Sequence, residues 1–139
     1  MSEFNEYNFL CHHGILGFFF ERSDTMDSIL KTIRQHVVGY DAANPAFDPQ
    51  LIDHTNAALW RLNQLNVGTR GFRITDETET WEDFMGTDER NVAMVIQYVQ
   101  DSVKLAFDPP QNSYHTNALK DRIDRTEWLL NVEVDPEYE

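Results

Sequence analysis

The chain has 139 residues, of which 41% are hydrophobic and 12% aromatic, and its 24 acidic against 11 basic side chains give a net charge of −13. This length allows one domain with a substantial core, and the aromatic content argues against a disordered chain. The acidic excess argues against binding to nucleic acid backbones, which depends on Lys and Arg, and favours protein partners or further copies of the chain.

Residues 1–22 mix acidic and aromatic side chains without a helical or strand period, which predicts an N-terminal arm that packs on a partner or is partly disordered. Glu3 and Glu6 stand where a signal peptide would carry positive charge, so no secretory signal is expected. No apolar run approaches the roughly 20 residues that a membrane span needs. The single cysteine, Cys11, allows no internal disulfide, which fits synthesis in a reducing cytoplasm.

Two amphipathic helices are expected next along the chain. The first spans about Asp24 to Val38, with Ser23 or Asp24 as its cap, and has an inner face of Met26, Ile29, Leu30, Ile33 and Val37. The second begins at Asp48-Pro49, because Pro is tolerated in a first turn, and ends in the glycine-containing segment 66–71. Its apolar stripe consists of Leu51, Thr55, Ala58, Leu59, Leu62 and Leu65.

The middle of the chain predicts shorter elements and a third long helix. The segment 72–74 has the composition of a short extended piece, and 80–85 indicates one capped helical turn closed by Gly86. Thr87 or Asp88 is the expected cap of a helix that runs to about Phe107, where the sequence Asp-Pro-Pro ends it. Because that helix is apolar on two sides, we expect it at the centre of the fold.

The last predicted helix spans about Ser113 to Asn131 and packs through Leu119, Ile123 and Leu130. Residues 132–139 are predicted to form an acidic C-terminal tail that could add as a strand to a neighbour. The sequence therefore predicts an all-α fold, a small helical bundle of four main helices. Its domains are an extended N-terminal arm (1–22), a helical domain (23–131) and the C-terminal tail (132–139).

Two tryptophans fall outside the predicted core stripes. At about 100° per residue, Trp60 lies roughly 180° from Leu51, and Trp128 lies roughly 180° from Leu119. Trp is favoured at protein interfaces because it combines a large apolar area with a polar N–H group. Either each indole is covered within the monomer by a loop or by the arm, or Trp60 and Trp128 are candidates for contacts between subunits.

No group of residues carries an enzymatic signature, and no cofactor or metal is expected. Cys11, His12 and His13 are adjacent in sequence and lack the further ligands that a tetrahedral metal site needs. An acidic cluster precedes the third long helix and consists of Asp76, Glu77, Glu79, Glu82 and Asp83. We interpret it as a solvated acidic loop, since it lacks the spacing of a calcium loop.

Several stretches taken in order resemble the head–tail connector (adaptor, or head-completion) family of long-tailed bacteriophages. The two most specific are Phe-Asp-Pro-Pro at 107–110 and Glu-Trp-Leu-Leu-Asn-Val at 127–132. They are accompanied by Leu-Asn-Gln-Leu-Asn-Val-Gly at 62–68 and Thr-Trp-Glu-Asp-Phe-Met-Gly-Thr-Asp at 80–88. The resemblance covers roughly residues 24–135.

This resemblance implies a structural virion protein that forms a ring, usually of twelve copies, beneath the portal protein. Such a ring extends the DNA channel without specific DNA binding and presents a platform for a downstream neck or tail-completion protein. By position, contact with the portal would fall on Val132, Val134 and Tyr138. The chain would be made in the host cytoplasm and would lie in the virion neck, with no membrane contact. A repulsive channel wall fits the net charge, and the acidic cluster at 76–83 is its candidate lining.

A rival interpretation uses the charge alone. An acidic protein can imitate DNA and inhibit a DNA-binding enzyme, and such an inhibitor would present a contiguous acidic face on a monomer or dimer. A connector would instead form rings or sediment with virus particles. A small enzyme is a third alternative, but no base, nucleophile and metal can be placed together from this sequence.

Overall fold

The computed structural model describes residues 27–39, 44–86 and 91–134. For residues 133 and 134 it describes the backbone but not the side chains. Within these ranges the chain forms α2 (Ile29–Val37), α3 (Asp48–Gln64), α4 (Trp81–Met85), α5 (Val92–Phe107) and α6 (Ser113–Val134), with a 3-10 turn, η2, at Pro45–Phe47. The described residues contain no strand. The predicted all-α fold with four main helices is therefore confirmed.

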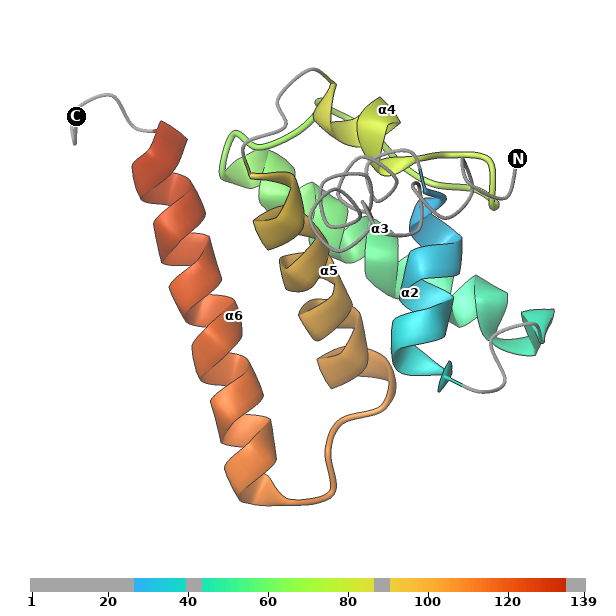
Figure 1. Ribbon diagram of the computed structural model, residues 1–139, viewed down its shortest axis with the longest axis vertical. Helices are drawn as coiled ribbons and strands as arrows, with labels where there is room; N and C mark the ends of the chain where they lie inside the picture. The colour runs from blue at the N-terminus through green and yellow to red at the C-terminus, as the bar shows by residue number, and fades with distance from the viewer. Residues whose placement is uncertain (1–26, 40–43, 87–90, 135–139) are drawn as a thin grey trace, which may run out of the picture.

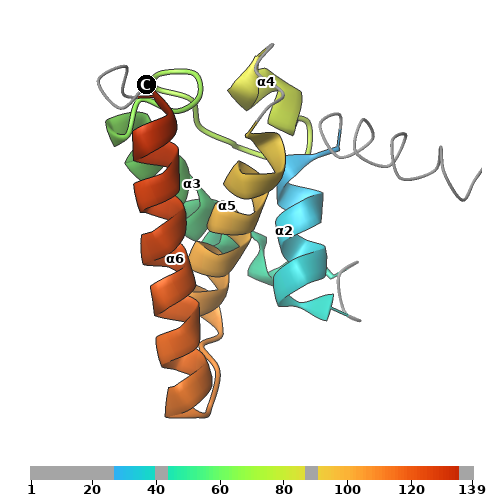
Figure 2. The same ribbon diagram turned by 60° about the vertical axis from the view of Figure 1, so that its left-hand side comes forward.

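Helix α5 lies in the middle of the bundle, as its two apolar sides predict. It packs against α2, α3 and α6, and α4 covers one of its ends. Figures 1 and 2 show α6 at one edge of the molecule and α2 on the other side of α5, with α3 crossing behind them. Helix α6 consequently has a long solvent-exposed side.

The predicted apolar faces form one core. Ile29, Leu30, Ile33 and Val37 of α2 are buried, and the α3 stripe is buried from Leu51 to Leu62, with Leu65 at the margin of the core. Leu130 of α6 belongs to the same core and Ile123 packs against it, while Leu119 is buried apart from that core. Helical periodicity thus identified the inner faces correctly, because burial of apolar area is the dominant stabilising term.

Helix α2 begins later than predicted. Ser28 has an extended backbone and its side chain accepts a hydrogen bond from the Lys31 backbone N–H, so Ser28 is the cap and Ile29 the first helical residue. Ser23, Asp24 and Met26 lie outside the described residues, as do Thr87 and Asp88, the predicted caps of the third long helix. Helix α5 begins at Val92, after Asn91, whose side chain makes no capping bond.

Helix α6 ends later than predicted. It continues through Val134, so Val132 and Val134 lie in its last turn and the predicted strand-like alternation there is wrong. The helix is also held to α5 by Arg122, which donates two hydrogen bonds of 2.8 and 2.7 Å to the buried carboxylate of Asp101. This bidentate geometry is the strong form of an ion pair.

The segment between α3 and α4 is irregular and is fixed by side chains instead of strand pairing. Asn56 accepts from the backbone N–H of Ile74 and donates to its carbonyl oxygen, at 2.8 and 3.0 Å, so it satisfies the backbone as a neighbouring strand would. The predicted extended piece at 72–74 therefore forms no strand. Helix α4 matches its prediction, since Thr80 and Asp83 form a reciprocal capping box and Gly86 ends the helix at φ +67°.

Candidate interaction surfaces

The two tryptophans predicted to face away from the core are exposed. Trp60 on α3 retains 63% of its surface and Trp128 on α6 retains 62%, whereas Trp81 on α4 is fully buried. The indole N–H of Trp81 donates to the Thr32 hydroxyl at 3.2 Å, so its polar group is satisfied inside the protein. Two exposed indoles on a chain of this size are candidate anchors for a partner.

Arg61, which follows Trp60, forms an ion pair with Glu127, which precedes Trp128. Arg61 donates to both carboxylate oxygens of Glu127, at 2.9 and 3.1 Å, and joins α3 to α6. The buried hydroxyl of Tyr98 on α5 donates to the same carboxylate at 2.6 Å. The hydrogen bond from Arg61 lowers the pKa of Glu127, and burial together with Glu127 raises the pKa of Tyr98.

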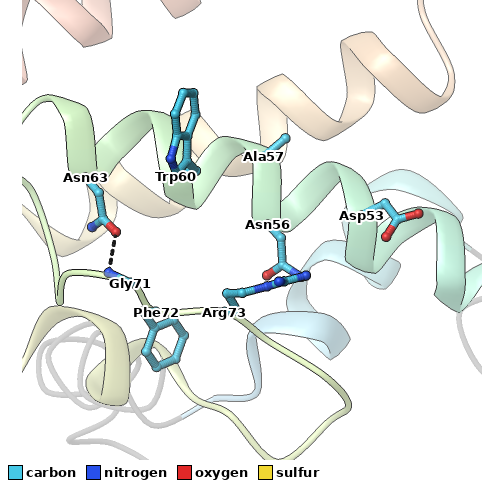
Figure 3. A pocket seen from close by; sticks show the side chains of 8 residues that line it. All are labelled: Asp53, Asn56, Ala57, Trp60, Asn63, Gly71, Phe72 and Arg73. Carbon is cyan, nitrogen blue, oxygen red and sulfur yellow. Dashed lines mark hydrogen bonds between the residues drawn. The ribbon is translucent and has the colours of Figure 1, made fainter.

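The outer side of α3 forms one wall of a surface groove of about 380 Å³. Figure 3 shows Trp60 and its α3 neighbours on one side and the loop of Gly71, Phe72 and Arg73 on the other. Asn63 fixes this loop, because its amide donates to the carbonyls of Val67 and Thr69 and accepts from the Gly71 N–H at 3.0 Å. The groove is completed by Asp53, Asn56 and Ala57.

In the predicted acidic cluster Glu79 is half-buried and the other four acidic residues are exposed, and most of the carboxylates shape the local chain. Asp76 accepts from the backbone N–H and the hydroxyl of Thr78, which lowers the pKa of Asp76. Glu79 accepts from Thr75 and from the Asp76 N–H. Asp83 belongs to the capping box, and Glu82 is exposed on α4.

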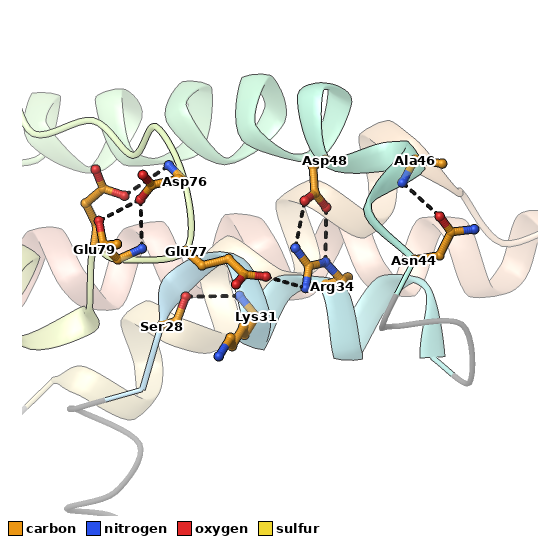
Figure 4. Close-up of polar contacts among 10 residues, drawn as sticks. Ser28, Lys31, Arg34, Asn44, Ala46, Asp48, Asp76, Glu77 and Glu79 are labelled. Carbon is orange, nitrogen blue, oxygen red and sulfur yellow. Dashed lines mark hydrogen bonds and ion pairs between the residues drawn. The ribbon is translucent and has the colours of Figure 1, made fainter.

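Glu77 has a separate role in joining the acidic loop to the bundle. Its carboxylate lies 2.8 Å from a guanidinium nitrogen of Arg34, and Arg34 also donates two hydrogen bonds to Asp48 at the start of α3 (Figure 4). Both carboxylates raise the pKa of Arg34, which is only 6% exposed. Only part of the predicted acidic surface is therefore free to face a partner.

Of the candidate portal-binding residues, Val132 is half-buried and Val134 is the last residue of α6. Tyr138 lies outside the described residues. Val132 and Val134 thus lie in the last turn of α6, and their contact with the portal stays a prediction.

The match to a family model decides the chain's membership. The family is the phage connector proteins, and its model matches residues 29–137, which include every helix described above. The chain belongs to this family. No curated protein and no solved structure matches it.

Membership makes the chain a connector-type structural protein of a bacteriophage, which confirms the resemblance read from the sequence. A structural family also supports the prediction that the chain is not an enzyme. The match begins at the first residue of α2, so the predicted arm at residues 1–22 lies outside it.

Sequence reasoning missed the groove and the ion pair beside it. Asn56 and Asn63 lie seven residues apart on one side of α3, a spacing that places them on the same face, and this was a usable signal for an attached loop. Arg61 and Glu127 are 66 residues apart, and nothing in their local sequence indicates a pairing.

The described part of the chain contains neither a metal-binding cluster nor a membrane-spanning helix. No group of three His, Cys, Asp or Glu residues there is arranged to hold a metal ion, while Cys11, His12 and His13 lie outside it. No described helix is long and apolar enough to cross a membrane.

Proposed function

We propose that this connector protein forms a ring between the portal and the tail of a phage particle, in the virion neck. The observation that carries the proposal is the family match over the whole helical body, since connector proteins join parts of the virion. The ring extends the DNA channel and presents a platform for a neck or tail-completion protein. Twelve copies are expected, as in the rings that the resemblance implies.

Trp60 and Trp128 serve as contacts between subunits in this ring. Both are large, exposed and on regular helices, so their positions are fixed before assembly. A closed ring needs one surface of each subunit to meet a different surface of the next, and the two indoles supply two such anchors.

The loop at 76–83 lines the channel. Asp76 and Glu82 are exposed and Glu79 is partly exposed, so these acidic side chains can face the interior of a channel. A ring multiplies these charges, and the resulting negative potential repels the phosphates of DNA that passes through.

The end of α6 contacts the portal through Val132, Val134 and Tyr138. Val132 and Val134 follow Leu130, the last residue of α6 that is buried among the side chains described, by two and four residues. Apolar side chains at a projecting helix end are suited to insertion into an apolar portal site.

Electron microscopy of phage particles tests the whole proposal. We expect density for a ring of this helical bundle directly below the portal, with the acidic loops toward the axis and the α6 ends toward the portal. Particles made without the chain should lack tails, and supplying the chain should restore them. Absence of the chain from the neck of complete particles would refute the proposal.

A further inference from the structure

Five of the nine Lys and Arg side chains in the described ranges form no ion pair with a described residue, and two of the five lie on the loop of the α3 groove. Arg34, Arg61, Lys104 and Arg122 are each held by a carboxylate. By contrast, Arg70 and Arg73 are exposed and form no ion pair with any described residue, and Arg73 lines the groove. A groove lined by Trp60, Phe72 and the guanidinium group of Arg73, with Arg70 on the adjoining loop, is suited to an acidic partner that also carries an aromatic side chain.

Helix α6 of the same chain presents a surface of that chemistry. Asp124 and Asp121 lie one and two turns before Trp128, so the three side chains share one side of the helix. All three are exposed, and neither aspartate forms an ion pair within the described ranges. Arg125, which is also exposed, lies three residues before Trp128 and is opposite in charge to Asp53 of the groove.

We propose that Trp128 of one copy packs into the α3 groove of a neighbouring copy, with Asp121 and Asp124 beside that copy's Arg70 and Arg73. The inference rests on the proposed ring and names the two surfaces that meet in it. The groove, about 380 Å³ in volume, lies near the lower limit of small-molecule pockets, so it suits one large side chain better than a folded segment.

The contact joins two different surfaces, because the groove belongs to α3 and its loop while the inserted indole belongs to α6. Such contacts continue from copy to copy and close into a ring when the rotation permits. The contact also assigns separate tasks to the tryptophans: Trp128 is inserted, and Trp60 is part of the surface that receives it.

Mixed single-cysteine variants test the geometry. In full-length chain carrying Cys11→Ser, Arg73→Cys and Asp124→Cys are made separately, mixed, and treated with a short thiol-reactive cross-linker. We expect the mixture to yield several-fold more cross-linked dimer than either variant alone. A mixture of Arg73→Cys with Gln35→Cys, an exposed position on α2, is the matched control and should show no such excess.

Each other outcome of the cross-linking overturns the proposal. A dimer from Arg73→Cys alone would mean that two grooves face each other, and a dimer from Asp124→Cys alone would mean that two α6 helices do. Equal yields in all mixtures would mean that the groove does not receive α6.

Charge reversal tests the same contact in solution and in particles. Arg73→Glu and Asp124→Arg should each reduce self-association several-fold, and the double variant should recover most of it, while Lys31→Glu on α2 supplies a matched change of charge elsewhere. Failure of the double variant to recover overturns the contact. Immunoblots of purified particles distinguish failure of the groove contact from failure of the proposed function. If the chain is present in the particles although the groove contact is absent, only the contact is refuted.

Discussion

A hydrogen atom is the only side chain that fits at Gly68. The residue has φ +80°, and a Cβ built there would overlap the ring of the buried Phe84. Gly71 has a similar φ of +75°, but a Cβ there meets nothing within 4 Å. A substitution at Gly71 therefore incurs backbone strain alone, whereas one at Gly68 incurs both backbone strain and steric overlap.

We expect Gly68→Ala to lower the free energy of unfolding more than Gly71→Ala does. Both changes incur the left-handed backbone cost of about 1–2 kcal/mol, and Gly68→Ala adds an overpacking cost of about 1–3 kcal/mol. Urea denaturation of the two variants measures the difference. Equal losses would show that Phe84 moves aside without cost.

Thr55 on α3 is fully buried and its hydroxyl has no hydrogen-bond partner. Thr126 on α6 is also buried, but its hydroxyl donates to the Arg122 carbonyl at 2.8 Å. Thr55→Val should raise the free energy of unfolding by about 1 kcal/mol, because an unsatisfied polar group is replaced by a methyl group of similar shape. Thr126→Val should not raise it, and thermal unfolding of both variants makes the comparison. Destabilisation by Thr55→Val would indicate that a water molecule satisfies the hydroxyl.

At the scale of helices, sequence patterns predicted faces better than ends. Apolar spacing located the buried sides of α2, α3 and α6 and the outward positions of Trp60 and Trp128, because a helix repeats regularly along its whole length. The start of α2 was misplaced because Ser23, Asp24 and Ser28 are all acceptable caps by residue type. Ser28 is selected by a tertiary contact, the hydrogen bond from the Ile29 N–H to the Glu79 carbonyl.

The groove and the ion pairs could not be predicted in the same way. Arg34 binds carboxylates from the start of α3 and from the acidic loop, and which of the many acidic residues would be chosen depends on how the helices cross. The acidic cluster was recognisable in the sequence, but the internal hydrogen bonds of Asp76, Glu79 and Asp83 follow from the conformation of the loop.

The link between α3 and α6 should weaken in acid. Because Arg61 lowers the pKa of Glu127, the pair contributes stability above the usual Glu pKa of about 4.3 and loses it as the pH falls through the lower folded value. The contribution at neutral pH should be about 1 kcal/mol or less, since nearly half of the Arg61 side chain is exposed. We expect the stability advantage of wild type over Glu127→Gln to shrink between pH 6 and pH 3, as measured by urea midpoints.

Arg61→Gln provides the control for this pH dependence. Without the guanidinium group, the main cause of the lowered pKa of Glu127 is absent. The difference in stability between Arg61→Gln and the double variant that carries Arg61→Gln and Glu127→Gln should therefore change less with pH. An advantage that stays constant in the wild-type background would mean that Glu127 contributes through its hydrogen bond from Tyr98 and not through its charge.

For the whole molecule, the net charge of −13 opposes the assembly that the proposed function requires. Each added copy brings further negative charge to the ring, and this repulsion acts over the Debye length, which is about 30 Å at 0.01 M salt and about 8 Å at 0.15 M. The attractive pairs proposed between the groove and α6 are exposed, and such pairs contribute about 0–1 kcal/mol each. Repulsion among whole subunits should therefore decide the response to salt.

Self-association of the purified chain should increase as the salt concentration rises from about 0.01 to 0.15 M, because screening shortens the range of repulsion between copies. Analytical ultracentrifugation over a salt series measures it. Arg73→Glu, which adds to the negative charge and removes a proposed attraction, should associate less than wild type at every salt concentration. Association that falls with added salt would mean that ion pairs between copies outweigh the net charge, and the repulsive lining proposed for the channel would then lose its physical basis.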